Sequence, residues 1–181
     1  MKKVLLVLSI VAMVGVAQAN LLVFDNADFH DGLNGWGLAG DVTFSDGGGY
    51  GVMDGVAGGW GVFVATDAGI PLASLGVSAG DTITVEMDMI LLAGAGNPGI
   101  KIESWGGGGH ISNSGDINGA ITGSWATYSW DYTIAAGADA LKFVPLWGGG
   151  ASVGYDNLSI VPEPATMALL GLGALVLRRK K

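Results

Sequence analysis

The sequence predicts an all-β domain, a β-sandwich of the jelly-roll type, flanked by two short terminal signals. Three observations predict this fold. Apolar and polar residues alternate with a period of two through several short segments. Glycine, with 33 of 181 residues, gathers in clusters between these segments, as turn residues do. No internal segment keeps the 3.6-residue period of an amphipathic helix over three turns.

The predicted strands follow one another between the glycine clusters. The clearest is residues 81–89, in which apolar residues from Ile83 to Met89 occupy every second position. Such a strand has one buried and one solvated face. Residues 125–134 repeat the pattern with aromatic side chains. The remaining strands are predicted at residues 60–67, 140–147 and 151–161. Many short strands joined by glycine-rich turns are typical of a sandwich.

The first 19 residues are predicted to be a secretory signal peptide. Lys2 and Lys3 precede an apolar run at residues 4–17, and Ala17-Gln18-Ala19 forms an A-x-A cleavage site. We therefore expect signal peptidase to cut after Ala19. An uncleaved membrane anchor is the alternative, but the apolar run is short for a segment that must cross a bilayer.

The last 21 residues, 161–181, have three parts in a fixed order. An extended Pro162-Glu163-Pro164 linker precedes an uncharged stretch at residues 165–177, and four bases follow. As a helix the stretch would reach about 20 Å at 1.5 Å per residue, less than the roughly 30 Å bilayer core. Basic side chains at its end would remain cytoplasmic and help a short helix reach the interface.

This order resembles the PEP-CTERM sorting signal. The residues that carry the resemblance are Pro162, Glu163, Pro164, Arg178, Arg179, Lys180 and Lys181. It implies a precursor anchored in the inner membrane of a Gram-negative bacterium by a short transmembrane helix, and cleavage near Pro-Glu-Pro by an exosortase. The expected destination is the cell envelope, the cell surface or an exopolysaccharide-rich matrix. A plain C-terminal tail anchor is the alternative.

The charge of the middle domain, residues 20–160, excludes several functions. It contains 15 acidic residues and two bases, Lys101 and Lys142, so it cannot form the basic face that a nucleic-acid-binding protein needs. Anionic lipid surfaces are disfavoured for the same reason. The absence of cysteine excludes disulfides, thiolate metal sites and cysteine nucleophiles.

A second resemblance, to jelly-roll carbohydrate-binding modules, is distributed over the middle domain. Residues 26–36 (NADFHDGLNGW) resemble the opening of these modules, and residues 124–146 and 153–160 resemble their last strands. The resemblance implies a structural calcium ion. Asp156 matches one of its usual ligands, but His30 stands where a glutamate is usual.

Two sets of candidate site residues follow. Tryptophans next to glycine-rich turns could form a platform for sugar rings, because the apolar C–H face of a pyranose matches a flat aromatic ring; otherwise they pack at strand ends. These are Trp60, Trp105 and Trp147. Carboxylates that could hold calcium despite the loss of the glutamate are Asp25, Asp28 and Asp156.

No catalytic residue is predicted. Residues 76–80 (GVSAG) fit a nucleophile-elbow pattern, but a strand rather than a helix follows the serine. His30, His110 and the neighbouring acids Glu86 and Asp88 are interpreted as surface residues. We therefore expect an exported, exosortase-processed envelope or matrix protein whose non-catalytic sandwich binds exopolysaccharide. A glycan-active hydrolase or lyase on the same fold, and a purely structural surface protein, are the alternatives.

Overall fold

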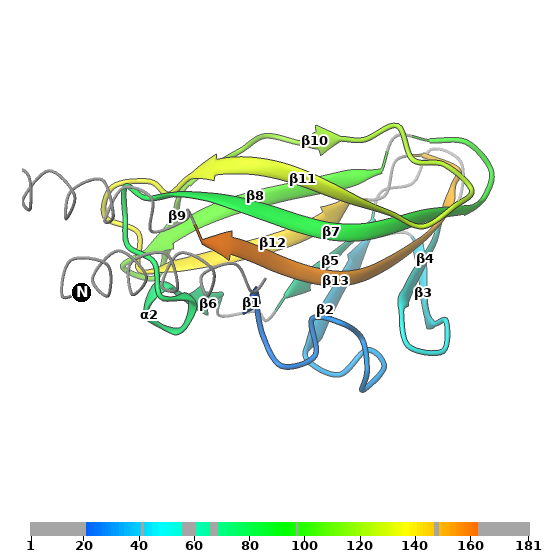
Figure 1. Ribbon diagram of the computed structural model, residues 1–181, viewed down its shortest axis with the longest axis horizontal. Coiled ribbons are helices and arrows are strands. Elements are labelled where there is room, and N and C mark those ends of the chain that lie inside the picture. Colours follow the sequence, from blue (N-terminus) through cyan, green and yellow to red (C-terminus); the bar gives the residue numbers. More distant parts are fainter. Residues whose placement is uncertain are drawn as a thin grey trace, which may run out of the picture.

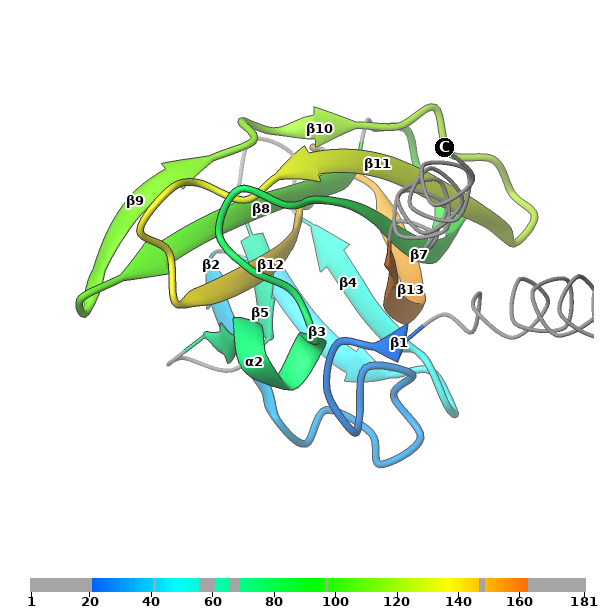
Figure 2. The ribbon, with the colours of Figure 1, turned by 60° about the vertical axis from the view of Figure 1, so that its left-hand side comes forward.

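The fold is known from a computed structural model that describes residues 21–40, 42–55, 61–65, 69–96, 98–146 and 149–162. These residues form two antiparallel β-sheets that pack face to face, with a short helix, α2 (Leu72–Leu75), beside one of them (Figures 1 and 2). The predicted all-β sandwich is confirmed.

The first sheet has the strand order β11–β7–β13–β4–β3, and β1 also pairs with β13. Its long central strands β7 and β13 run antiparallel along most of their length (Figure 1). The bounds of its strands are β1 (Leu21–Leu22), β3 (Val42–Asp46), β4 (Gly51–Gly55), β7 (Thr82–Ala93), β11 (Ala126–Thr133) and β13 (Ser152–Pro162).

The second sheet has the strand order β10–β8–β12–β5–β2, with β6 paired to β12 and β9 paired to β8. Its bounds are β2 (Trp36–Gly40), β5 (Gly61–Ala65), β6 (Ile70–Pro71), β8 (Gly99–Gly106), β9 (Gly109–Asn113), β10 (Ile117–Asn118) and β12 (Ala140–Leu146). The five predicted strands correspond to β5, β7, β11, β12 and β13.

Strand β8 was not predicted from its sequence, because a serine interrupts its apolar face. Ile100 and Ile102 point into the core, and so does Ser104, which is fully buried. The Ser104 hydroxyl is hydrogen bonded to the hydroxyl of Tyr132 on β11, 2.7 Å away, and accepts a hydrogen bond from the Ala135 amide at 3.1 Å. The hydrogen bond links the two sheets across the core.

The core lies between the sheets and is built by the period-two alternation. Val85, Met87 and Met89 of β7 are completely buried, as are Phe143 of β12 and Tyr155 of β13. Residues between them on each strand point away from the core, so each sheet has an outer face. These outer faces, on opposite sides of the sandwich, carry the side chains that can meet a ligand.

The N-terminal motif at residues 26–36 is a closed loop held by one buried asparagine. The Asn26 side chain accepts a hydrogen bond from the Asp31 amide (2.7 Å) and donates to the carbonyls of Gly32 (2.9 Å) and Asn34 (2.7 Å). Trp36 donates its indole N–H to the Asn26 carbonyl at 3.0 Å. Much of the motif that resembles carbohydrate-binding modules therefore has a structural role.

A β-bulge in β13 fixes where this loop docks. The register of β13 against β7 shifts between Asp156 and Ser159, and Asn157 adopts a positive φ of 51°. The bulge lets the Leu158 amide donate to the carbonyl of Ala27 at 3.0 Å. The acidic residues of the N-terminal loop are thereby brought close to Asp156.

The predicted signal peptide, residues 1–19, and the sorting signal from Glu163 onward lie outside the described residues. Pro162 is the last residue of β13. Within the described ranges, no helix is long and apolar enough to cross a membrane.

Candidate functional site

The outer face of the second sheet carries a compact cluster of an aromatic ring and charged side chains. We call it the Trp105 surface: Lys101, Glu103 and Trp105 on β8, His110 on β9 and Lys142 on β12. Strand pairing assembles it, because Lys142 lies opposite Glu103 and His110 lies opposite Trp105. Both lysines of the middle domain are in this cluster.

The ring of Trp105 is fixed by contacts on several sides. Its indole N–H donates to Glu103 Oε2 at 2.9 Å. The Lys142 ammonium lies 4.1 Å from the ring centroid, a cation–π contact. His110 packs edge-to-face against the ring, with the two centroids 5.7 Å apart. The ring is thus held in one orientation.

Glu103 stays ionised at neutral pH. Partial burial would raise its pKa, but hydrogen bonds from Trp105 and Lys101 outweigh burial and lower the pKa below its usual value. Lys101 Nζ lies 3.1 Å from Glu103 Oε1. The Trp105 surface therefore offers an ionised carboxylate and two ammonium groups around an indole ring.

A second aromatic surface lies on the outer face of the first sheet and was not predicted. We call it the Trp125 surface: Tyr50, Ile90, Leu92, Trp125 and Gly154. The rings of Tyr50 and Trp125 meet edge-to-face at 5.3 Å. Trp125 keeps 44% of its surface exposed and Leu92 keeps 42%. The sequence does contain a signal for this surface. Trp125 is an odd number of residues away from the core-facing Tyr128 and Trp130, so along an extended chain its side chain points to the opposite face.

Trp105 is the member of the predicted tryptophan platform that the structure describes. Trp60 and Trp147 lie outside the described residues. Trp105 faces outward as the prediction requires, but Lys142 covers one side of its ring. Its role in binding sugar stays a prediction.

An acidic group gathers where the bulge of β13 meets the N-terminal loop. Both oxygens of Asp88 accept hydrogen bonds, from Thr127 Oγ1 at 2.6 Å and from Asn157 Nδ2 at 2.9 Å. Asp28 is hydrogen bonded to His30, which lowers the pKa of Asp28 and raises that of His30. Burial, together with the charges of Asp88 and Asp28, raises the pKa of Asp156 to about 6.

Two of the predicted calcium ligands, Asp28 and Asp156, belong to this group. No three carboxylate or imidazole side chains in the described part of the chain are placed to hold an ion together. Asp28 and Asp156 are near enough for their charges to interact, but Asp28 is already engaged by His30. His30 is bonded to Oδ1 of Asp28 and not to Oδ2. Calcium binding stays a prediction.

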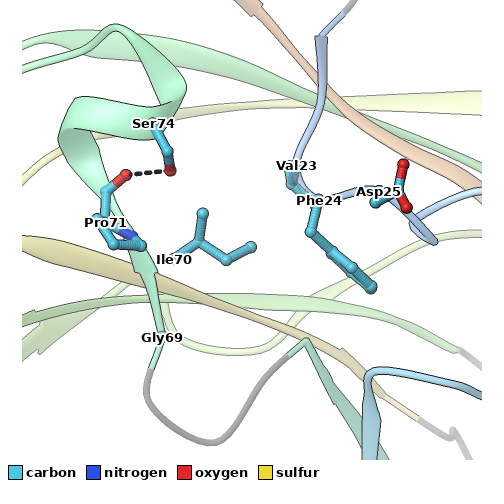
Figure 3. A pocket seen from close by; sticks show the side chains of 7 residues that line it. All are labelled: Val23, Phe24, Asp25, Gly69, Ile70, Pro71 and Ser74. Carbon is cyan, nitrogen blue, oxygen red and sulfur yellow. Dashed lines mark hydrogen bonds between the residues drawn. The ribbon is translucent and has the colours of Figure 1, made fainter.

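Asp25, the third predicted metal ligand, lines an open pocket of about 540 Å³. Figure 3 shows Asp25 beside Phe24 on one side of this pocket, with Ile70, Pro71 and Ser74 on the other. The Ser74 hydroxyl is used locally, donating to the Pro71 carbonyl at 2.7 Å. The pocket therefore offers a hydroxyl-rich ligand fewer polar partners than the Trp105 surface.

The nucleophile-elbow pattern at residues 76–80 has a structural explanation. Ser78 lies in the turn before β7, where its amide donates to Asp81 Oδ2 at 2.8 Å, and the next element is a strand rather than a helix.

The C-terminal segment matches a known family. Residues 161–181 match the family described as the PEP-CTERM protein-sorting motif. These residues are a PEP-CTERM sorting signal. The PEP-CTERM signal indicates an exported protein that is routed to the cell envelope, and it implies processing by an exosortase. No curated protein sequence matches the chain.

Solved structures share the sandwich. A CBM4 module is 16% identical with a TM-score of 0.53, over 77% of this chain and 99% of the module. The CBM22-1 xylan-binding domain of Paenibacillus barcinonensis Xyn10C is 16% identical with a TM-score of 0.54, over 81% of this chain and 96% of that domain. The enzymatically active domain of bacteriophage CBA120 tailspike protein 4 is 11% identical with a TM-score of 0.61, and this chain spans 21% of it. Identities this low show a shared fold alone.

Proposed function

We propose that this PEP-CTERM protein is a non-catalytic module that binds extracellular polysaccharide through the Trp105 surface. Signal peptidase and exosortase process it, and the mature domain resides in the cell envelope, at the cell surface or in the matrix. One observation carries the proposal: an indole ring held in a fixed orientation on an outer sheet face, with a carboxylate and both lysines of the domain around it.

The chemistry of these groups suits a sugar. A pyranose stacks its C–H face on an indole ring, and its hydroxyls hydrogen bond to carboxylates and ammonium groups. The hydrogen bond from Trp105 to Glu103 orients the ring before the ligand arrives, which reduces the entropy lost on binding. Lys142 covers one side of the ring, so a sugar that stacks there displaces its flexible side chain.

The state of the carboxyl groups on the outer faces favours a binding module over a glycoside hydrolase. A glycosidase needs one protonated carboxylic acid beside a second, free carboxylate. The pKa of Glu103 is lowered, so Glu103 is a poor proton donor. The pKa of Asp156 is raised to about 6, but both oxygens of its neighbour Asp88 are engaged by Thr127 and Asn157. Release of reducing ends from a bound polymer would favour the hydrolase instead.

Affinity electrophoresis of the purified exported protein through gels that contain single soluble polysaccharides tests the proposal. We expect at least one polysaccharide to retard the protein and Trp105→Ala to weaken that retardation. Affinity at the Trp105 surface itself should fall about tenfold, which corresponds to about 1.4 kcal/mol and is of the size of one aromatic contact. Ile111→Ala is the control, because it removes an exposed apolar side chain of the same β8–β9 hairpin. Equal retardation of Trp105→Ala and wild type would exclude the Trp105 surface as a polysaccharide-binding site. If none of the polysaccharides retards the wild-type protein, the result would favour a purely structural protein.

A further inference from the structure

The Trp125 surface is built around a glycine. A Cβ on Gly154 would lie 2.7 Å from Ile90 Cγ2, 3.1 Å from Tyr50 Cδ2 and 3.2 Å from Trp125 Cη2. The rings therefore rest directly on the backbone of β13, and this contact fixes them. Trp125 nevertheless remains 44% exposed. The ring is both anchored and accessible, as an aromatic platform has to be.

The Trp125 and Trp105 surfaces lie on opposite sides of the sandwich. Val153 and Tyr155 are buried between the sheets, so Gly154 points to the outer face of the first sheet. Ser104 is buried in the same core, so Trp105 points to the outer face of the second sheet. The two sheets form separate layers in Figure 2. A ligand on one surface leaves the other free.

Charge limits what the Trp125 surface can bind. The outer face of the first sheet carries Glu86, Asp88, Asp131 and Asp156, and no described residue in the strands of this sheet is a lysine, arginine or histidine. Anionic lipid headgroups and acidic polymers are therefore repelled. An uncharged ligand with an apolar face and many hydroxyls meets no such barrier.

A second copy of this chain is a poor binding partner for the Trp125 surface. Two copies that met symmetrically through this face would bring their acidic residues together without a compensating base. The four apolar side chains are also too few for the roughly 800 Å² per partner that a stable interface buries. A neutral sugar ring, by contrast, is comparable in size to an indole ring.

We propose that the Trp125 surface is a second binding surface, for a neutral polysaccharide chain, and that a single domain bridges two chains. The proposal rests on the proposed function, because bridging requires binding at the Trp105 surface as well. Thr127 and Asp88 follow and precede Trp125 and Ile90 by two residues and are hydrogen bonded to each other. Each carboxylate or hydroxyl oxygen has a second lone pair, which a sugar hydroxyl can use. Bridging would make the protein a cross-linker of the polysaccharide matrix.

Binding and cross-linking are measured separately on wild type, Trp105→Ala, Trp125→Ala and the double variant. Affinity electrophoresis in a neutral polysaccharide reports binding, and light scattering of a dilute solution of that polysaccharide reports cross-linking. We expect wild type to raise the scattering in proportion to protein added up to saturation. Each single variant should still be retarded yet lose most of the scattering increase, and the double variant should lose both.

The controls distinguish the loss of the aromatic ring from the loss of the folded structure. Trp125→Phe keeps an aromatic ring and should retain part of the cross-linking, while melting curves show which variants remain folded. If Trp125→Ala is folded and cross-links like wild type, the Trp125 surface is not a second binding surface, although the proposed function at the Trp105 surface still holds. A wild-type dimer in sedimentation without polysaccharide would also overturn bridging by one domain. If wild type binds no polysaccharide, the proposed function itself fails.

Discussion

The carboxyl group of Asp156 is the clearest electrostatic weakness of the domain, and its removal is expected to stabilise the fold. Asp156 is half-buried at the bulge of β13, near the charges of Asp88 and Asp28. These surroundings raise its pKa from 3.8 to about 6. Asp156→Asn keeps a side-chain oxygen that can accept the 2.8 Å hydrogen bond from the Asn157 amide, but removes the charge.

The sign and the size of the effect follow from linkage. Between pH 3.8 and about pH 6 the folded protein binds more protons at Asp156 than the unfolded chain does, so the free energy of unfolding falls as pH rises through this window. A shift of about two pKa units corresponds to a ceiling of about 3 kcal/mol. Because the side chain is partly exposed, solvent screening reduces this to about 1 kcal/mol.

Thermal melting in the presence of a chelator tests this expectation. At pH 8 we expect Asp156→Asn to melt about 3 °C above wild type, and at pH 4 the two should melt nearly together. Asp54→Asn, on the neighbouring strand β4, is the control for loss of an exposed carboxylate. A wild-type protein that melts with or above Asp156→Asn at pH 8, or a difference that persists unchanged at pH 4, would refute the reasoning.

Three further predictions concern packing, calcium and processing. Gly51→Ala places a Cβ against the fully buried Phe29 ring and should lower the free energy of unfolding in urea by about 1–3 kcal/mol, whereas Gly109→Ala, which has open space around it, should not. Millimolar calcium should raise the melting temperature by several degrees relative to chelator, and Asp156→Asn should abolish the rise; no rise in wild type would mean that no ion binds there. Intact-mass analysis should find a mature protein that begins at Asn20 and lacks residues 178–181, and retention of those bases would indicate a tail anchor.

The fold was predictable because its signals are local. Alternation in β7, β11 and β13 reports which residues face the core, and glycine clusters mark the turns. Strand β8 shows the limit of this reasoning. The burial of Ser104 depends on a hydroxyl from β11, 28 residues further along the chain, and no periodicity in β8 itself encodes that partner.

The candidate site was less predictable because it depends on register. Trp105 was singled out for its neighbouring glycines, but the presence of Lys142 above its ring follows from the pairing of β8 with β12. Trp125 was overlooked because its strand was interpreted through its core-facing aromatic residues. The proximity of Asp28 to Asp156 depends on the bulge at Asn157, because the Leu158 amide next to it holds the N-terminal loop.

The two sheets differ in charge, and this difference modifies the conclusion that an acidic domain repels every polyanion. Fifteen acidic residues against two lysines suggest a domain that repels every polyanion. The structure places both lysines around Trp105, where Lys101 neutralises Glu103 and Lys142 has an aromatic ring beneath it. Repulsion of polyanions therefore acts mainly at the outer face of the first sheet. The acidic residues there have little effect on a ligand at the opposite face, because physiological salt screens charges over ~8 Å. We therefore expect the Trp105 surface to accept a sugar that carries a carboxylate and the Trp125 surface to bind neutral chains only. If both surfaces bind, the two bridged chains need not belong to the same polymer.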